Sequence, residues 1–252
     1  MGIAWVLIAG LLGLFEDLYL EPEVLAGHLL TLEGSPNAVF YQPALLGSAT
    51  TLAVMGSQPF GMAGVTYARL ALSSHRWGWG VTTLRADAYQ EVSLHGGRAF
   101  QWSKGRFGVA LWGLQLRAGL EDRRVLGWDV GSATTLRGFH LALRLRAGLW
   151  PGWFWRSFPL RLALSSKIGI NPTVVLDVEF EEGYEPEWRL SALYTMTPLL
   201  TVGTGLSLSP PQWTLLMALS LSPEILYAVR VHPYLGLTHA LEIRWSPFGR
   251  VR

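Results

Sequence analysis

The charged side chains that could do chemistry stand at alternate positions within short apolar segments. In segment 138–149, Arg144 and Arg146 alternate with Leu143 and Leu145. Successive side chains of a β-strand point to opposite faces, so this spacing places charges on one face and apolar groups on the other. A slip of one residue would exchange the two faces. Strands of this kind are typical of a barrel wall that separates water from lipid.

The same alternation recurs in later segments and predicts a set of charges on the inner face of a barrel. Basic segment 159–168 precedes acidic segment 173–182, so ion pairs between neighbouring strands are expected. The pairs could neutralise a water-containing interior, or the charges could line a selective polar pore. The predicted inward-facing charges are Arg144, Arg146, Arg161, Lys167, Asp177, Glu179, Glu181, Glu187, Arg189, Arg230, Glu242 and Arg244.

Motifs for catalysis and metal binding are missing from the sequence. It contains no G-x-S-x-G, no H-E-x-x-H, no glycine loop for phosphate and no cysteine. We therefore expect no enzyme activity, no metal and no cofactor. The histidines, which show no metal-ligand spacing, are His28, His75, His95, His140, His232 and His239.

The composition favours a membrane protein built from strands. Only 15% of the residues are charged, against about 25% in a soluble domain. Twelve tryptophans suit the two membrane interfaces, and 28 glycines supply frequent turns. The net charge of +2, without a basic cluster, excludes nucleic acid as an expected partner.

Turn signals recur from Thr50 onward and divide the chain into fourteen predicted antiparallel strands, an all-β, up-and-down transmembrane barrel. Twelve strands is the alternative, because the first strand is weak and Gly96-Gly97 suggests a β-bulge. A soluble β-sandwich with one wet face is a further alternative. The predicted strands are 50–56, 62–72, 77–87, 90–102, 106–118, 125–135, 138–149, 159–168, 173–182, 187–196, 199–208, 212–221, 224–232 and 236–246.

The connections predict the orientation of the barrel. If the first and last strands both have their chain termini in the periplasm, the even-numbered connections are the periplasmic ones. These turns are tight, as at Arg137-Gly138 and Asn171-Pro172. The odd-numbered connections are longer, notably 119–124, 150–158 and 182–186. Short periplasmic turns opposite longer outer loops are typical of outer-membrane barrels.

The chain before the barrel divides into two parts. Residues 1–22 are signal-like, with an apolar core from Ile3 to Phe15, although no basic residue precedes the core and no clean cleavage site follows it. A retained anchor or a misassigned start are the alternatives. Within residues 23–47 the apolar residues stand at the spacing of a short amphipathic helix, and residues 48–248 are predicted to form the barrel.

Two segments resemble the FadL-like superfamily of outer-membrane barrels, and most closely its PorV-like members of type IX secretion. The segment SPNAVFYQPALL, residues 35–46, is similar to the motif where the plug meets the first strand, with Gln42 in place of asparagine. Residues 227–245 are similar to the last hairpin of PorV-like barrels. The resemblance implies a fourteen-stranded barrel and a plug formed by residues 23–47. The plug motif comprises Phe40, Tyr41, Gln42, Pro43 and Ala44. That plug could be an ordinary cap on the barrel end or a gate.

The resemblance implies two functions. The first is an accessory subunit bound to a larger envelope protein complex, with Trp150, Trp153, Phe154 and Trp155 as a docking loop or an interfacial girdle. The alternative is a channel for small or hydrophobic solutes, although the inward charges disfavour a fatty-acid tunnel. Both place the chain in the lipid of the bacterial outer membrane.

Overall fold

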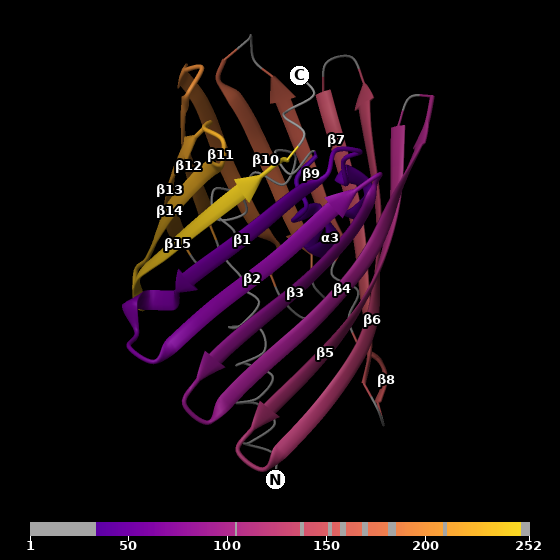
Figure 1. Cartoon of the computed structure of the whole chain (residues 1–252), viewed down its shortest axis with the longest axis vertical. Helices are drawn as coiled ribbons and strands as arrows, with labels where there is room; N and C mark the ends of the chain where they lie inside the picture. The colour runs from indigo at the N-terminus through magenta and orange to yellow at the C-terminus, as the bar shows by residue number, and fades with distance from the viewer. Residues whose placement is uncertain are drawn as a thin grey trace.

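The computed structural model describes residues 34–103, 105–136, 139–150, 153–156, 160–167, 171–180, 185–208 and 211–247. The signal-like segment, the start of the predicted plug up to residue 33, and Glu181 lie outside these ranges. In the described part of the chain, fifteen strands form one antiparallel sheet, which Figure 1 shows wrapped around an interior.

The strands follow one another in an up-and-down order. Their bounds are β1 Thr51–Gln58, β2 Val65–Ser74, β3 Trp77–Ala86, β4 Tyr89–Trp102, β5 Gly105–Ala118, β6 Glu121–Leu136, β7 Phe139–Trp150, β8 Trp153–Arg156, β9 Leu160–Lys167, β10 Thr173–Phe180, β11 Glu187–Thr197, β12 Leu200–Leu208, β13 Pro211–Leu219, β14 Glu224–His232 and β15 Gly236–Trp245.

Pairing carries the sheet around a complete ring. β1 pairs with both β2 and β15, and β6 pairs with both β5 and β7. Short β8 and then β9 run consecutively along β7, so together they occupy one position in the wall. The ring therefore has the fourteen positions that the sequence predicts rather than twelve, and the predicted fold class is confirmed.

Alternation along β13 explains why these residues form a wall. The side chains of Trp213, Leu215 and Met217 are 61%, 64% and 43% exposed, whereas Gln212 and Thr214 are buried. The exposed apolar side faces outward, where lipid replaces water as its solvent. Backbone groups are satisfied between strands, as a lipid environment requires.

The expected bulge at Gly96-Gly97 is wrong. β4 is continuous, with Gly96 opposite Leu111 and Gly97 opposite Ala110. A β-carbon on Gly96 would lie only 2.7 Å from the indole of Trp79 on the outer face. The glycine therefore makes room for a neighbouring ring and does not interrupt the strand.

The expected long outer loops are also wrong for two connections. Residues 119–124 are not a loop, because Ala118 pairs with Glu121 across a two-residue turn that contains Gly119 at φ +59°. β4, β5 and β6 extend instead, to 14, 14 and 16 residues. In the second connection Trp150 pairs with Trp153, so the predicted aromatic loop is largely a hairpin. The side chains of this hairpin lie outside the described residues.

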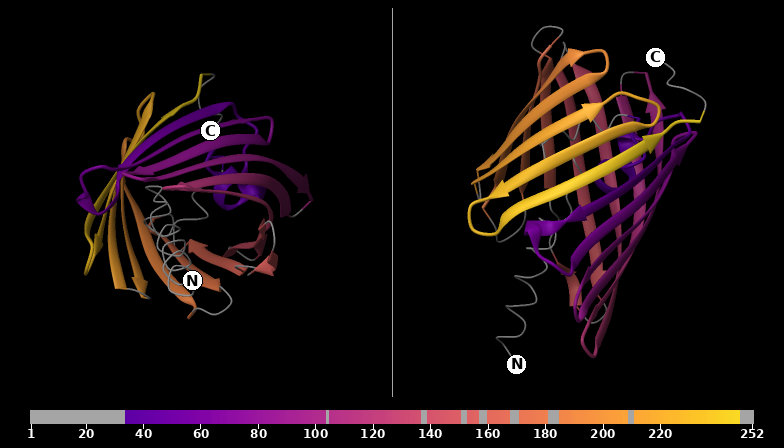
Figure 2. Two further views of the ribbon diagram at one scale, coloured as in Figure 1. Left: turned by 90° about the horizontal axis from the view of Figure 1, so that it is seen from below. Right: turned by 60° about the vertical axis from the view of Figure 1, so that its left-hand side comes forward.

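The described plug comprises residues Gly34 to Leu46. It contains α3, Ala38–Tyr41, and the 3-10 turn η2, Pro43–Leu45. Figure 1 and the left view of Figure 2 show it inside the ring, against the strands β3 to β6. A second 3-10 turn, η3, Pro59–Gly61, joins β1 to β2.

No helix in the described ranges is long and apolar enough to cross a membrane.

Candidate functional site: the plug and the inner wall

Four inward-facing glycines form the surface on which the plug lies, here called the plug seat: Gly78 and Gly80 of β3, Gly108 of β5 and Gly131 of β6. A methyl group on Gly80 would overlap the ring of Phe40, and one on Gly131 would overlap the side chain of Gln42. At Gly108 the overlap would be with plug backbone, which cannot rotate away. The wall is thus shaped to hold this segment.

Pro43 and Ala44 are the plug residues whose backbone lies against Gly108. The proline favours the tight turn of η2 by fixing its own φ angle. Ala44 is completely buried, so its small side chain fits the narrow space between plug and wall. These two residues of the predicted motif therefore bring backbone close to the wall.

Polar side chains fasten the plug at both edges of the seat. Asn37 donates its amide to the carboxylate of Glu242 on β15 at 2.8 Å. Arg144 on β7 donates to the backbone carbonyl oxygen of Phe40 at 2.9 Å. Gln42 donates its amide to the carbonyl oxygen of Leu143 at 3.0 Å. Hydrogen bonds to charged groups contribute about 1.5–3 kcal/mol each, so the first two are the stronger fastenings.

An aromatic group surrounds Arg69 of β2. Its guanidinium lies 4.4 Å from the centre of the Phe40 ring, and it donates to the hydroxyl of Tyr41 at 2.6 Å and to the hydroxyl of Tyr67. His95 of β4 contacts the same Phe40 ring edge-on, with the ring centres 4.7 Å apart. Phe40 is therefore held by a cation on one strand and an imidazole on another.

A buried carboxylate organises the arginines beside the plug. Asp129 of β6 is fully buried and contacts Arg144 at 2.9 Å and Arg146 at 3.2 Å. Arg146 also lies over the ring of Trp112 at 4.9 Å. Because Arg144 bridges Asp129 and Phe40, the ion pair of the wall and the position of the plug depend on one another.

The predicted inward-facing charges fall into three groups: those that bind the plug, those that form ion pairs beside it, and those elsewhere on the inner face. Arg144 and Glu242 hold the plug, and Arg146 and Arg244 pair with the carboxylates of Asp129 and Glu242. Away from the plug, the inner face also carries Asp177, Glu187, Arg189 and Arg230. Arg161 stands opposite Glu179, and Lys167 opposite Thr173, in the backbone register. The side chains of Arg161, Lys167 and Glu179 lie outside the described residues.

Four residues of this site were not predicted from the sequence: Asn37, Arg69, His95 and Asp129. Asp129 and Arg69 each alternate with apolar residues, so the rule applied to the later strands would have placed them inside. Asn37 and His95 gave no comparable signal, because their roles depend on where the plug crosses the barrel. No cluster of three or more potential metal ligands occurs among the described residues.

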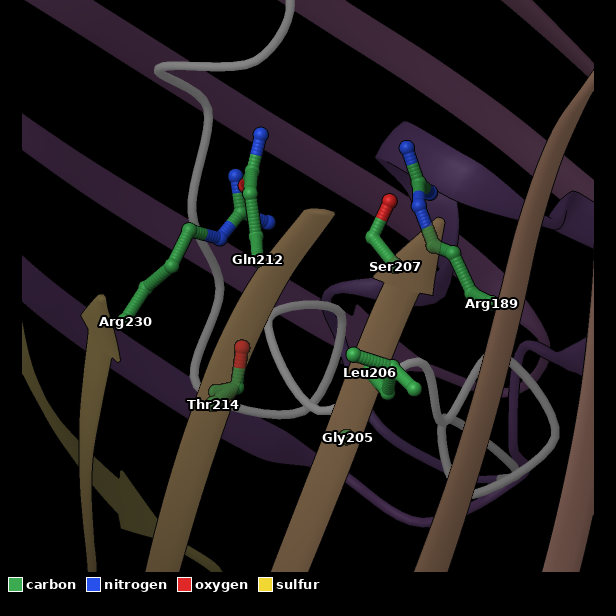
Figure 3. A pocket seen from close by; sticks show the side chains of 7 residues that line it. All are labelled: Arg189, Gly205, Leu206, Ser207, Gln212, Thr214 and Arg230. Carbon is green, nitrogen blue, oxygen red and sulfur yellow. The ribbon is translucent and has the colours of Figure 1, made fainter. Parts of the chain in front are cut away.

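A polar surface lies across the ring from the plug seat and is here called the polar wall. It consists of Arg189, Ser207, Gln212, Thr214 and Arg230 on β11 to β14. Figure 3 shows the side chain of Arg230 beside that of Gln212, and the side chain of Arg189 beside that of Ser207. Glu187 accepts from Arg189 at 2.7 Å and from Ser207 at 2.8 Å. A cavity of about 10 Å³ lies among the wall residues, enough for one water molecule.

No protein-family model matches the chain, and no curated protein matches it. Solved structures do. The CymD monoaromatic hydrocarbon channel aligns with a TM-score of 0.57 at 9% identity, covering 85% of this chain and 93% of that one. Omp33 of Acinetobacter baumannii aligns at 0.54 and 11% identity, covering 79% and 99%. The P. putida toluene transporter TodX aligns at 0.54 and 9% identity, covering 84% and 94%.

At these identities the likeness establishes the fold alone, which is that of an outer-membrane β-barrel. With its apolar outer face, the chain lies in the bacterial outer membrane, as the sequence predicts. The closer resemblance to PorV-like proteins finds no support in these comparisons.

Proposed function

We propose that the protein is an outer-membrane channel for small polar solutes, partly occluded by its plug. The observation that carries this proposal is the asymmetry of the interior. The fastenings of the described plug come from β2, β7 and β15, and the plug seat lies on β3, β5 and β6. By ring order, the polar wall on β11 to β14 stands opposite.

The chemistry of the polar wall supports polar rather than apolar solutes. Gln212 and Thr214 offer neutral donors and acceptors, and Arg189 and Arg230 offer cationic donors. Such groups replace the hydration of a polar solute as it passes, whereas an apolar solute would leave them unsatisfied. The fold relatives include channels named for hydrocarbons, but that specificity belongs to those proteins.

The accessory role, placed first from the sequence resemblance, has less support than the channel. The similar structures include a hydrocarbon channel and a toluene transporter. Two of the residues predicted for docking, Trp150 and Trp153, pair within a hairpin rather than forming a loop. Binding to a larger envelope protein complex stays a prediction, tested by co-purification from solubilised outer membranes.

Solute uptake by liposomes tests the channel directly. Liposomes that contain the purified barrel should swell in small sugars and amino acids, faster than protein-free liposomes and more slowly as solute mass rises. Swelling no faster than in protein-free liposomes for every polar solute would contradict the proposal. Uptake restricted to apolar solutes would replace the polar specificity with a hydrophobic one.

A further inference from the structure

A step in the barrel rim creates a second cavity, which adjoins the plug seat through Ala99, opposite Gly108, and lies apart from the polar wall. β3 begins at Trp77, which pairs with Arg98, whereas β4 continues to Trp102. The last residues of β4 therefore stand above the β2–β3 turn, at the rim where β1 begins and β15 ends. Here lies a cavity of about 440 Å³, called the rim cavity, lined by Ser48, His75, Arg76, Arg98, Ala99, Phe100 and Gln101.

The turn beneath the rim cavity has an unusual conformation. Its two residues, His75 and Arg76, have φ angles of 51° and 67°, in the left-handed region that residues other than glycine seldom adopt. Three backbone hydrogen bonds hold it. The N–H groups of His75 and Arg76 donate to Ser48 at 3.0 Å and Gly47 at 2.9 Å, and the carbonyl of Arg76 accepts from Ala99 at 2.9 Å. The bonds fix two basic residues at the cavity.

The lining of the rim cavity is basic. It contains two arginines and a histidine, and no carboxylate is among its seven residues. Arg76 donates one bond to Gln101 at 2.5 Å, and a guanidinium carries five N–H donors. The guanidinium of Arg98 lies over the rings of Trp77 at 4.8 Å and Phe100 at 5.0 Å. These rings hold the planar group while its edge stays free for an anion.

The surroundings place this cavity at the level of the lipid head groups. Trp77 and Trp79 are stacked on the outer face, with ring centres 6.5 Å apart. Both are exposed, as are Phe100 and Trp102 on the neighbouring strand. Exposed tryptophans in a barrel wall mark the interface between acyl chains and head groups.

We propose that the rim cavity binds the phosphodiester head group of a phospholipid from the adjacent leaflet. Arg76 and Arg98 bind the phosphate oxygens, and the exposed aromatic residues contact the first part of the acyl chains. The site suits an anionic group because no carboxylate among the lining residues repels it, and the neighbouring exposed aromatic residues suit an anion that carries acyl chains. This binding is independent of whether the barrel conducts solutes.

Native mass spectrometry with a short-chain phosphatidylglycerol tests the site. The purified wild-type barrel should bind one phosphatidylglycerol molecule more tightly than any further one. The double variant Arg76→Gln/Arg98→Gln should weaken the binding of that first molecule about tenfold or more. The matched control is Arg85→Gln/Arg124→Gln, which removes the same charge from exposed positions at the opposite rim. Equal binding by wild type and the Arg76/Arg98 variant would overturn the proposal, as would equal weakening in the control.

A second variant covers the case in which the double variant does not fold. Gln101→Glu keeps both arginines and supplies a competing carboxylate beside Arg76, so it should also weaken lipid binding. Inorganic phosphate forms the other arm of the experiment. It should displace the lipid poorly, because it lacks the acyl chains that contact Trp77 and Phe100. Displacement by inorganic phosphate at a concentration similar to that of the lipid would overturn the assignment to a lipid.

Discussion

Arg144 of the wall donates a hydrogen bond of 2.9 Å to the backbone carbonyl of Phe40 in the plug. The same guanidinium contacts Asp129 at 2.9 Å, and all three residues are buried. A wall charge and the plug backbone are therefore coupled through one side chain.

Replacing Arg144 by Met tests that coupling. The change leaves the carboxylate of Asp129 with fewer partners and removes the bond to Phe40, so it should lower the free energy of unfolding by about 3–5 kcal/mol. Urea unfolding in lipid vesicles, followed by heat-modifiable gel mobility, measures it. Arg117→Gln, at an exposed pair with Asp122, should cost less than about 1 kcal/mol. Equal losses would mean that Arg144 is not a fastening.

The register of β13 predicts opposite outcomes for two neighbouring substitutions. Leu215→Glu places a carboxylate in lipid near the middle of the strand, so the barrel should assemble poorly. Thr214→Glu places it inside, directly opposite Arg230 in the register, so the barrel should assemble. The fraction with heat-modifiable mobility after refolding distinguishes them. Equal yields would show that the strand faces are wrongly assigned.

The polar wall should contribute to solute passage. Thr214→Val keeps the shape of the side chain but removes its hydroxyl, and loss of one neutral hydrogen bond of about 1 kcal/mol should slow polar uptake roughly fivefold. Thr204→Val makes the same change on the outward, exposed face of β12 and should leave uptake unchanged. Uptake that is equally fast in both variants would remove the polar wall from the path.

Much of the barrel could be predicted from the sequence, because lipid on one side enforces strict alternation. Segment 212–221 shows this, since one register exposes Trp213 and Leu215 and buries Gln212. Strand ends were less predictable. The sequence predicts Gly119 as part of a long loop, because a glycine is compatible with a long loop as well as with a two-residue turn.

The candidate site was harder to predict than the wall. Arg144 and Glu242 could be placed inside by alternation, but their bonds to Phe40 and Asn37 depend on the path of the plug. Gly108 and Gly131 also mark where the plug contacts the wall, but the sequence alone does not predict that contact. A glycine in a strand signals a bulge or a close backbone approach equally well, and only the plug decides between them.

Gly108→Ala tests the central claim that the plug occludes the channel. The added methyl would overlap the backbone of Pro43 and Ala44, so the plug must move, whereas Gly56→Ala adds a methyl to open space on the outer face. We predict that in planar bilayers the wild type and Gly56→Ala show a small conductance, because the plug leaves only part of the bore open, while folded Gly108→Ala shows a clearly larger one. A large, steady conductance in the wild type that Gly108→Ala leaves unchanged would contradict the account.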